Sequence, residues 1–128
     1  MSPINGIGKR DKQPLAALNG GDIQTIYQLK AQMLDRLDVP PVIADLAQSA
    51  HMSPTKLKRL FKQIFGDSIF RYYQAMRMQE AVRLLQAEKR SVSEVGYQLG
   101  FTNLSHFSRV FEEHMGLKPK KFSALPTD

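Results

Sequence analysis

One helical pattern occurs twice in this chain, fifty residues apart. Residues 53–66 align with residues 103–116, so that Gly66 aligns with Gly116. In each copy the apolar side chains recur every three or four residues, which predicts a helix with one buried stripe. Each copy begins at a residue that caps helices and ends at a glycine, which closes a helix most easily in the left-handed conformation. The sequence therefore predicts two equivalent, capped helices.

A shorter amphipathic segment precedes each copy. Val42–Ala50 leads into the first, and Ser91 with Glu94 forms a capping box that opens the segment before the second. A short helix, a tight turn and a second capped helix are the signature of a helix-turn-helix unit. Ala47 aligns best with Gly96, an offset of 49 rather than 50 residues, so we expect one extra residue in the second turn.

The other segments set the domain organisation. Residues 1–21 contain Pro and Gly without a helical period, which predicts a tail or linker. An amphipathic helix is expected from Asp22, and residues 22–122 are expected to form one all-α domain. We predict that this domain consists of a first helix-turn-helix unit (22–66), a long connecting helix (68–88) and a second unit (91–122), followed by a C-terminal tail (123–128).

The amino-acid composition limits the classes of function that this chain can have. Eighteen Lys and Arg residues against twelve acidic ones give a net charge of +6, which suits a polyanionic partner. The absence of Cys excludes thiol nucleophiles and thiolate metal sites. No apolar run approaches the roughly 18 residues of a membrane span, so a soluble cytoplasmic protein without a membrane partner is expected. Nothing in the sequence calls for a cofactor or a metal.

The face of each repeated helix opposite the apolar stripe is polar, and we call it the reading face. In the first helix it consists of Thr55, Lys58, Arg59 and Lys62. In the second it consists of Ser105, Ser108, Arg109 and Glu112, with His106 beside it. Arg suits the O6 and N7 atoms of guanine, and Ser, Thr and His can bond to several bases. These side chains predict contacts with the edges of DNA bases.

Phosphate contacts are expected around the reading faces. The helix N-termini at Ser53 and Asn103 can offer backbone N–H groups to phosphate. Further candidates are the basic residues Lys56, Lys62, Lys118, Lys120 and Lys121. The first helix is more basic than the second, which continues into Glu112 and Glu113, so we expect the first unit to be anchored more firmly.

The expected length of the connecting helix is close to the distance between two successive major grooves of DNA. About 21 residues at ~1.5 Å each give ~30 Å. Successive major grooves on one side of B-DNA lie about 34 Å apart. One chain could therefore read two adjacent groove segments of an asymmetric site.

The sequence closely resembles the DNA-binding domain of the AraC/XylS family of bacterial transcription regulators. The resemblance is carried by three stretches: PPVIADLAQSAHMSPTKLKRLFKQIFG, RMQEAVRLL and SVSEVGYQLGFTNLSHFSRVFEEHMGLKP. It implies seven helices in two homeodomain-like helix-turn-helix subdomains that bind double-stranded promoter DNA and activate transcription, often by touching RNA polymerase. The first stretch looks most like regulators of siderophore and iron uptake. By position, the family's base-reading residues fall on Thr55, Lys58, Arg59, Ser105, His106, Ser108 and Arg109.

The resemblance also draws attention to single positions. Arg77 matches an arginine common in the connecting helix, for which a structural role is expected. Gly96 stands where the family usually has Ala, so a helix less stable by up to ~1 kcal/mol is expected there. The pair Glu112–Glu113 replaces residues that are commonly basic. Family members usually carry an N-terminal effector or dimerisation domain, and about 21 residues before the first helix are too few for one, so we expect either a short member or a fragment.

Two other classes of function fit the sequence less well. An enzyme is disfavoured because the three His residues lack metal-ligand spacing with acids and no glycine loop for phosphate is present. A helical protein-interaction module that never touches nucleic acid is the alternative. The dependence of DNA binding on salt distinguishes it from a DNA-binding domain.

Overall fold

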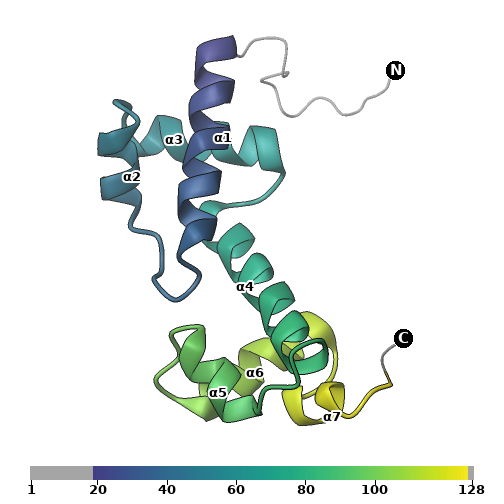
Figure 1. Ribbon diagram of the computed structural model, residues 1–128. Coiled ribbons are helices and arrows are strands. Elements are labelled where there is room, and N and C mark those ends of the chain that lie inside the picture. Colours follow the sequence, from purple (N-terminus) through teal and green to yellow (C-terminus); the bar gives the residue numbers. More distant parts are fainter. Residues whose placement is uncertain (1–18, 127–128) are drawn as a thin grey trace, which may run out of the picture. The chain divides into compact units, whose positions relative to one another are not determined.

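The computed structural model describes residues 19–126, and this part of the chain is all-helical (Figure 1). Its helices are α1 (Gly20–Asp35), α2 (Ile43–Ser49), α3 (Pro54–Phe65), α4 (Ile69–Gln86), α5 (Val92–Gln98), α6 (Leu104–Met115) and α7 (Pro119–Ser123). The predicted all-α fold with two helix-turn-helix units is confirmed. Most of the tail predicted over 1–21 lies outside the described residues, and α1 begins at Gly20 rather than at Asp22.

The helices form two compact units. The first unit combines the chain up to Gln32 with Val42–Ile69, and therefore holds most of α1 together with α2 and α3. The second unit combines Met33–Pro41 with the chain from Phe70 onward, and therefore holds α4 to α7. The connecting helix is thus part of the second unit rather than a separate spacer.

The first unit is built around buried side chains from its three helices. Ile26 and Leu57 are fully buried, and Ala47 from α2 is 2% exposed. Tyr27 follows the helical spacing of the apolar residues of α1 but is 50% exposed. Its ring lies 5.1 Å from that of Phe65, so it packs on the rim of the unit. The helical period alone could not separate the rim from the core.

The second unit has a larger apolar core. It contains fully buried side chains from α4, α5 and α6, namely Met78, Ala81, Leu84, Leu85, Val95, Phe107 and Phe111. Phe122 of α7 packs against this core, with its ring 5.5 Å from that of Phe111. The apolar face of α4 explains why this helix belongs to the second unit.

Local signals fix the ends of the two repeated helices. The side chain of Ser53 accepts a hydrogen bond from the backbone N–H of Lys56, and that of Asn103 accepts one from His106. Gly66 and Gly116 end α3 and α6 in the left-handed conformation. The predicted caps are therefore confirmed, and these two helices begin and end where the sequence indicated.

The predicted capping box of α5 is also confirmed. The backbone N–H of Glu94 donates to the Ser91 hydroxyl, while the Glu94 carboxylate accepts from the backbone N–H of Ser91. These hydrogen bonds favour the ionised carboxylate, so the pKa of Glu94 lies below its usual value. The box fixes the start of α5, which packs against α6.

Candidate nucleic-acid interface

The reading face of α3 is exposed in the first unit. Thr55, Lys58, Arg59 and Lys62 all lie at the surface. The other side of the helix holds its buried residues, Leu57, Leu60 and Phe61. Since one turn of helix separates Lys58 and Arg59 from Lys62, the basic side chains line a single strip along α3.

Lys56 differs from the other cations of α3. Its Nζ atom lies 3.4 Å from Oδ2 of Asp22 in α1, and the side chain is only partly exposed. An exposed ion pair of this kind contributes little to stability, but it offsets part of the charge of Lys56. Among the cations of α3, those on the reading face are therefore better placed than Lys56 for a negatively charged ligand.

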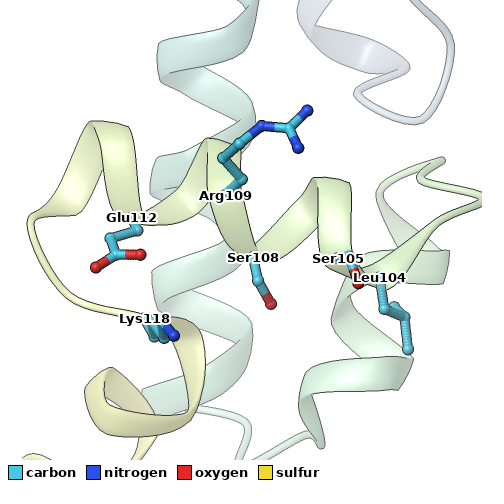
Figure 2. A pocket seen from close by; sticks show the side chains of 6 residues that line it. All are labelled: Leu104, Ser105, Ser108, Arg109, Glu112 and Lys118. Atoms are coloured by element: carbon cyan, nitrogen blue, oxygen red, sulfur yellow. The ribbon is translucent and has the colours of Figure 1, made fainter.

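The reading face of α6 surrounds a shallow depression in the second unit. The depression has a volume of about 450 Å³ and is lined by Leu104, Ser105, Ser108, Arg109, Glu112 and Lys118 (Figure 2). Ser108 and the guanidinium of Arg109 extend to opposite sides of the α6 ribbon in this view. All four predicted members of this reading face thus border one concave surface.

His106 lies beside the depression rather than in it. The side chain is exposed, and its ring stands edge-on to that of Phe101 with 5.5 Å between the ring centroids. Phe101 is itself buried at the end of the turn that precedes α6. The turn therefore holds the His106 ring at the N-terminal end of the reading face.

The three lysines after α6 do not share one position. Lys118 is the N-cap residue of α7 and lines the depression, whereas Lys120 and Lys121 lie within α7 and are not part of its lining. All three are exposed. The structure therefore brings Lys118 to the reading face of α6 and leaves the other two outside it.

Leu104 is the residue of this surface that the sequence analysis missed. It stands one turn before Phe107 and so continues the apolar stripe towards the Asn103 cap, and it is half-buried at the first position of α6. An apolar residue directly after the Asn103 cap, at the end of the apolar stripe that borders Ser105 and Ser108, was the available signal.

A buried arginine of α4 contacts the turn that leads into α6. The Nε atom of Arg77 in α4 donates to the backbone carbonyl of Leu99 at 2.9 Å, and the guanidinium lies 3.8 Å from the centroid of the Phe101 ring. Burial lowers the pKa of Arg77 from its usual value. Because Leu99 and Phe101 flank the turn that leads into α6, Arg77 ties this turn to α4, which agrees with the structural role expected for it.

A second polar group of α4 reaches the loop between α1 and α2. The Tyr73 hydroxyl donates to the carbonyl oxygen of Leu37 at 2.7 Å, and burial raises the pKa of Tyr73. The loop thereby closes over the second unit. Hydrogen bonds from α4 thus fix two segments of the second unit, the turn before α6 and the loop between α1 and α2.

Some kinds of site are not found among residues 19–126. No group of three or more His, Asp or Glu side chains there could hold a metal ion. No helix in that range combines the length and the apolarity that crossing a bilayer requires.

The chain matches a known family over most of its length. A family profile described as a helix-turn-helix domain covers residues 46–124. The arabinose operon regulatory protein of Escherichia coli K12 is 35% identical over 82 residues, which are 64% of this chain and 28% of that protein. The regulator GbdR of Pseudomonas aeruginosa is 31% identical over 107 residues, 84% of this chain and 29% of that protein. Among the curated relatives compared, the chain spans between 28% and 38% of their length.

Two solved structures of DNA-binding domains have a fold similar to that of this chain. An AraC-type DNA-binding domain protein from Chromobacterium violaceum superposes with a TM-score of 0.72 at 28% identity, covering 85% of this chain and 100% of that one. The DNA-binding domain of AdpA, solved with its target DNA, gives a TM-score of 0.71 at 26% identity, covering 78% and 90%. The chain belongs to the AraC-type family of helix-turn-helix domains, the DNA-binding domains of transcription regulators.

Proposed function

We propose that this chain recognises a specific promoter sequence by inserting α3 and α6 into successive major grooves of double-stranded DNA. One observation carries the proposal: each unit exposes an arginine, Arg59 or Arg109, at the same position of an equivalently capped helix. A solvated charged face is common on single helices, but two matched faces in a basic chain favour a shared polyanionic ligand. The solved complex of AdpA with its target DNA supports the same kind of partner.

The side chains divide into two groups by their chemistry. Those proposed to contact base edges are Thr55, Lys58, Arg59, Ser105, His106, Ser108 and Arg109. Those proposed to contact phosphates are Lys56, Lys62, Lys118, Lys120 and Lys121, together with the backbone N–H groups at the helix starts after Ser53 and Asn103. Base contacts set the preferred sequence, while phosphate contacts set the affinity for any sequence.

Selection of bound duplexes from random DNA tests the proposal directly. We expect an asymmetric motif in two segments about one helical turn apart, since the two reading faces differ. Footprinting on the selected site should protect both segments. A single protected segment would show that only one unit enters a groove.

The dependence of affinity on salt separates this function from its alternative. Contact with about six to eight phosphates predicts a slope near −5 to −7 when the logarithm of the binding constant is plotted against the logarithm of the salt concentration. A helical module that binds only proteins would select no DNA motif. Failure to bind any duplex at low salt would therefore contradict the proposal.

The role of the whole regulator extends the proposal. The chain acts in the cytoplasm, associated with the nucleoid and without enzymatic activity, and it favours transcription by contacting RNA polymerase at the promoter. The 29% identity to the transcriptional activator RhaR of Cronobacter sakazakii, over 108 residues, supports activation. Transcription in vitro from the selected site, with and without the protein, distinguishes activation from repression.

A further inference from the structure

The depression on α6 contains one apolar side chain among polar ones. Leu104 borders it together with Ser105, Ser108, Arg109, Glu112 and Lys118. Figure 2 shows Leu104 at the N-terminal end of α6, next to Ser105. The side chain is half-buried, so part of its apolar surface remains open to a ligand on the reading face. The polar side chains of the lining can form hydrogen bonds with a ligand, whereas the open part of Leu104 can make only an apolar contact.

The side chain of Leu104 packs in space that is free because Gly96 has no Cβ atom. A Cβ at Gly96 of α5 would lie 2.8 Å from Cδ2 of Leu104 and 3.0 Å from Cδ2 of Phe107. Both distances are shorter than ordinary contacts between carbon atoms. The space left free by Gly96 is therefore the space in which Leu104 and Phe107 pack. The sequence suggested only that the glycine makes its helix less stable. The structure shows that it also leaves room for these two side chains to pack.

The first unit has a different arrangement at the equivalent place. Ala47, a buried residue of α2, aligns with Gly96, and the exposed Pro54 aligns with Leu104 at the first position of α3. The pair formed by Gly96 and Leu104 is thus particular to the second unit. A half-buried leucine at the border of only one reading face indicates a contact that only one half of the DNA site needs.

Thymine offers the matching chemistry. Its C5-methyl group is the apolar feature among the base edges of the major groove, where the other groups are hydrogen-bond donors and acceptors. We propose that Leu104, seated by Gly96, contacts the methyl group of a thymine and so determines specificity in the DNA half-site of α6. This inference rests on the proposed insertion of α6 into the major groove and adds the class of base that is read there.

Replacement of thymine by uracil tests the contact, because uracil lacks only the methyl group. Each thymine in the α6 half of the selected site is replaced in turn, and the binding constant of the full chain is measured. Loss of one buried methyl group is expected to weaken binding about fourfold at one position. With Leu104→Ala that position should become insensitive to the replacement.

Two further variants keep the test informative if Leu104→Ala folds poorly. Leu104→Gln retains the length of the side chain, should abolish the uracil effect and should shift the preferred base towards adenine, which Gln can bond through two atoms. Gly96→Ala introduces the Cβ that displaces Leu104, and should reduce the uracil effect without changing the salt slope. Leu125→Ala, an exposed apolar residue outside the depression, is the matched control and should keep the full effect.

The outcomes separate the two proposals. A selected motif without any uracil-sensitive position in the α6 half would overturn the role of Leu104 and leave DNA recognition intact. A uracil effect that persists in Leu104→Gln would assign the methyl contact to another residue. If no motif is selected at all, the proposed function fails and the thymine contact fails with it.

Discussion

The two helix-turn-helix units make the same turn with different residues. His51 and Gly100 both adopt the left-handed conformation, with φ of 56° and 89°. In both turns the next backbone N–H bonds to the carbonyl of the small residue in the preceding helix, from Met52 to Ala47 and from Phe101 to Gly96. The expected extra residue of the second turn follows, since Thr102 precedes the Asn103 cap and has no counterpart before Ser53.

The difference lies in what surrounds each turn. A Cβ at Gly100 would collide with the backbone carbonyl oxygen of Asp38, in the loop that closes over the second unit. His51 is exposed and carries a full side chain in the same conformation. The comparison teaches that one backbone conformation can tolerate a side chain in one unit and forbid it in the other, because tertiary contacts add a second constraint.

Core truncation is expected to have the largest effect on both units. Leu57 and Phe107 occupy equivalent, fully buried positions. Leu57→Ala should lower the free energy of unfolding by about 2–5 kcal/mol and Phe107→Ala by about 3–5 kcal/mol, since each leaves a cavity. Urea denaturation followed by circular dichroism measures both. An unchanged midpoint for either variant would show that the two cores are not equivalent.

Substitutions of the left-handed residue in each turn should change the stability of the protein by different amounts. Gly100→Ala is expected to destabilise the protein by at least about 2 kcal/mol, because the left-handed conformation alone costs a residue with a side chain roughly 1–2 kcal/mol and the contact with Asp38 adds to it. His51→Gly removes that strain and should stay within about 1 kcal/mol of the original protein. Thermal unfolding of the two variants checks this difference, and equal effects would refute it.

The two arginines test whether the reading faces act separately. Arg59→Ala should lose about 1–3 kcal/mol of discrimination at one base pair in the half-site of α3 and leave the other half unchanged. Arg109→Ala should do the same in the half-site of α6. Repeating the selection with each variant locates the relaxed position. Lys62→Ala is the control, since loss of a phosphate contact should weaken all sequences alike.

The smallest expected effect comes from the difference in charge. Lys62 and Glu112 stand at equivalent positions of α3 and α6. Glu112→Lys should raise the affinity for any duplex and steepen the salt slope by about 1, because it adds one phosphate contact. Lys62→Glu should make the slope shallower by a similar amount or more. A slope unaffected by Glu112→Lys would mean that this end of α6 does not approach the backbone of the DNA.

Local chemistry made much of the molecule predictable. The helix starts at Ser53, Ser91 and Asn103 and the ends at Gly66 and Gly116 depend on a few neighbouring residues, so the sequence indicates them directly. The exposure of the reading faces follows from helical period in the same way. Whether each of those side chains contacts a base or a phosphate stays a prediction.

Other features depend on residues far apart in the chain. Tyr27 fits the apolar period of α1 but lies at the rim, because its neighbours, Phe65 among them, cover only part of it. The consequence of Gly96 was not foreseen, since its effect comes from Leu104 and Phe107 in another helix. Periodicity describes one helix at a time, so it carries no information on which partner covers a given side chain.

The sequence by itself determined the repeated plan of this protein: two capped helices with apolar and polar faces in register, because caps and periods are set within a few residues. Only the tertiary structure decided that Arg77 holds the second turn, that Gly100 must lack a side chain and that Leu104 lines the depression on α6. These properties arise where helices distant in sequence come within van der Waals or hydrogen-bond distance, and packing alone brings those atoms together.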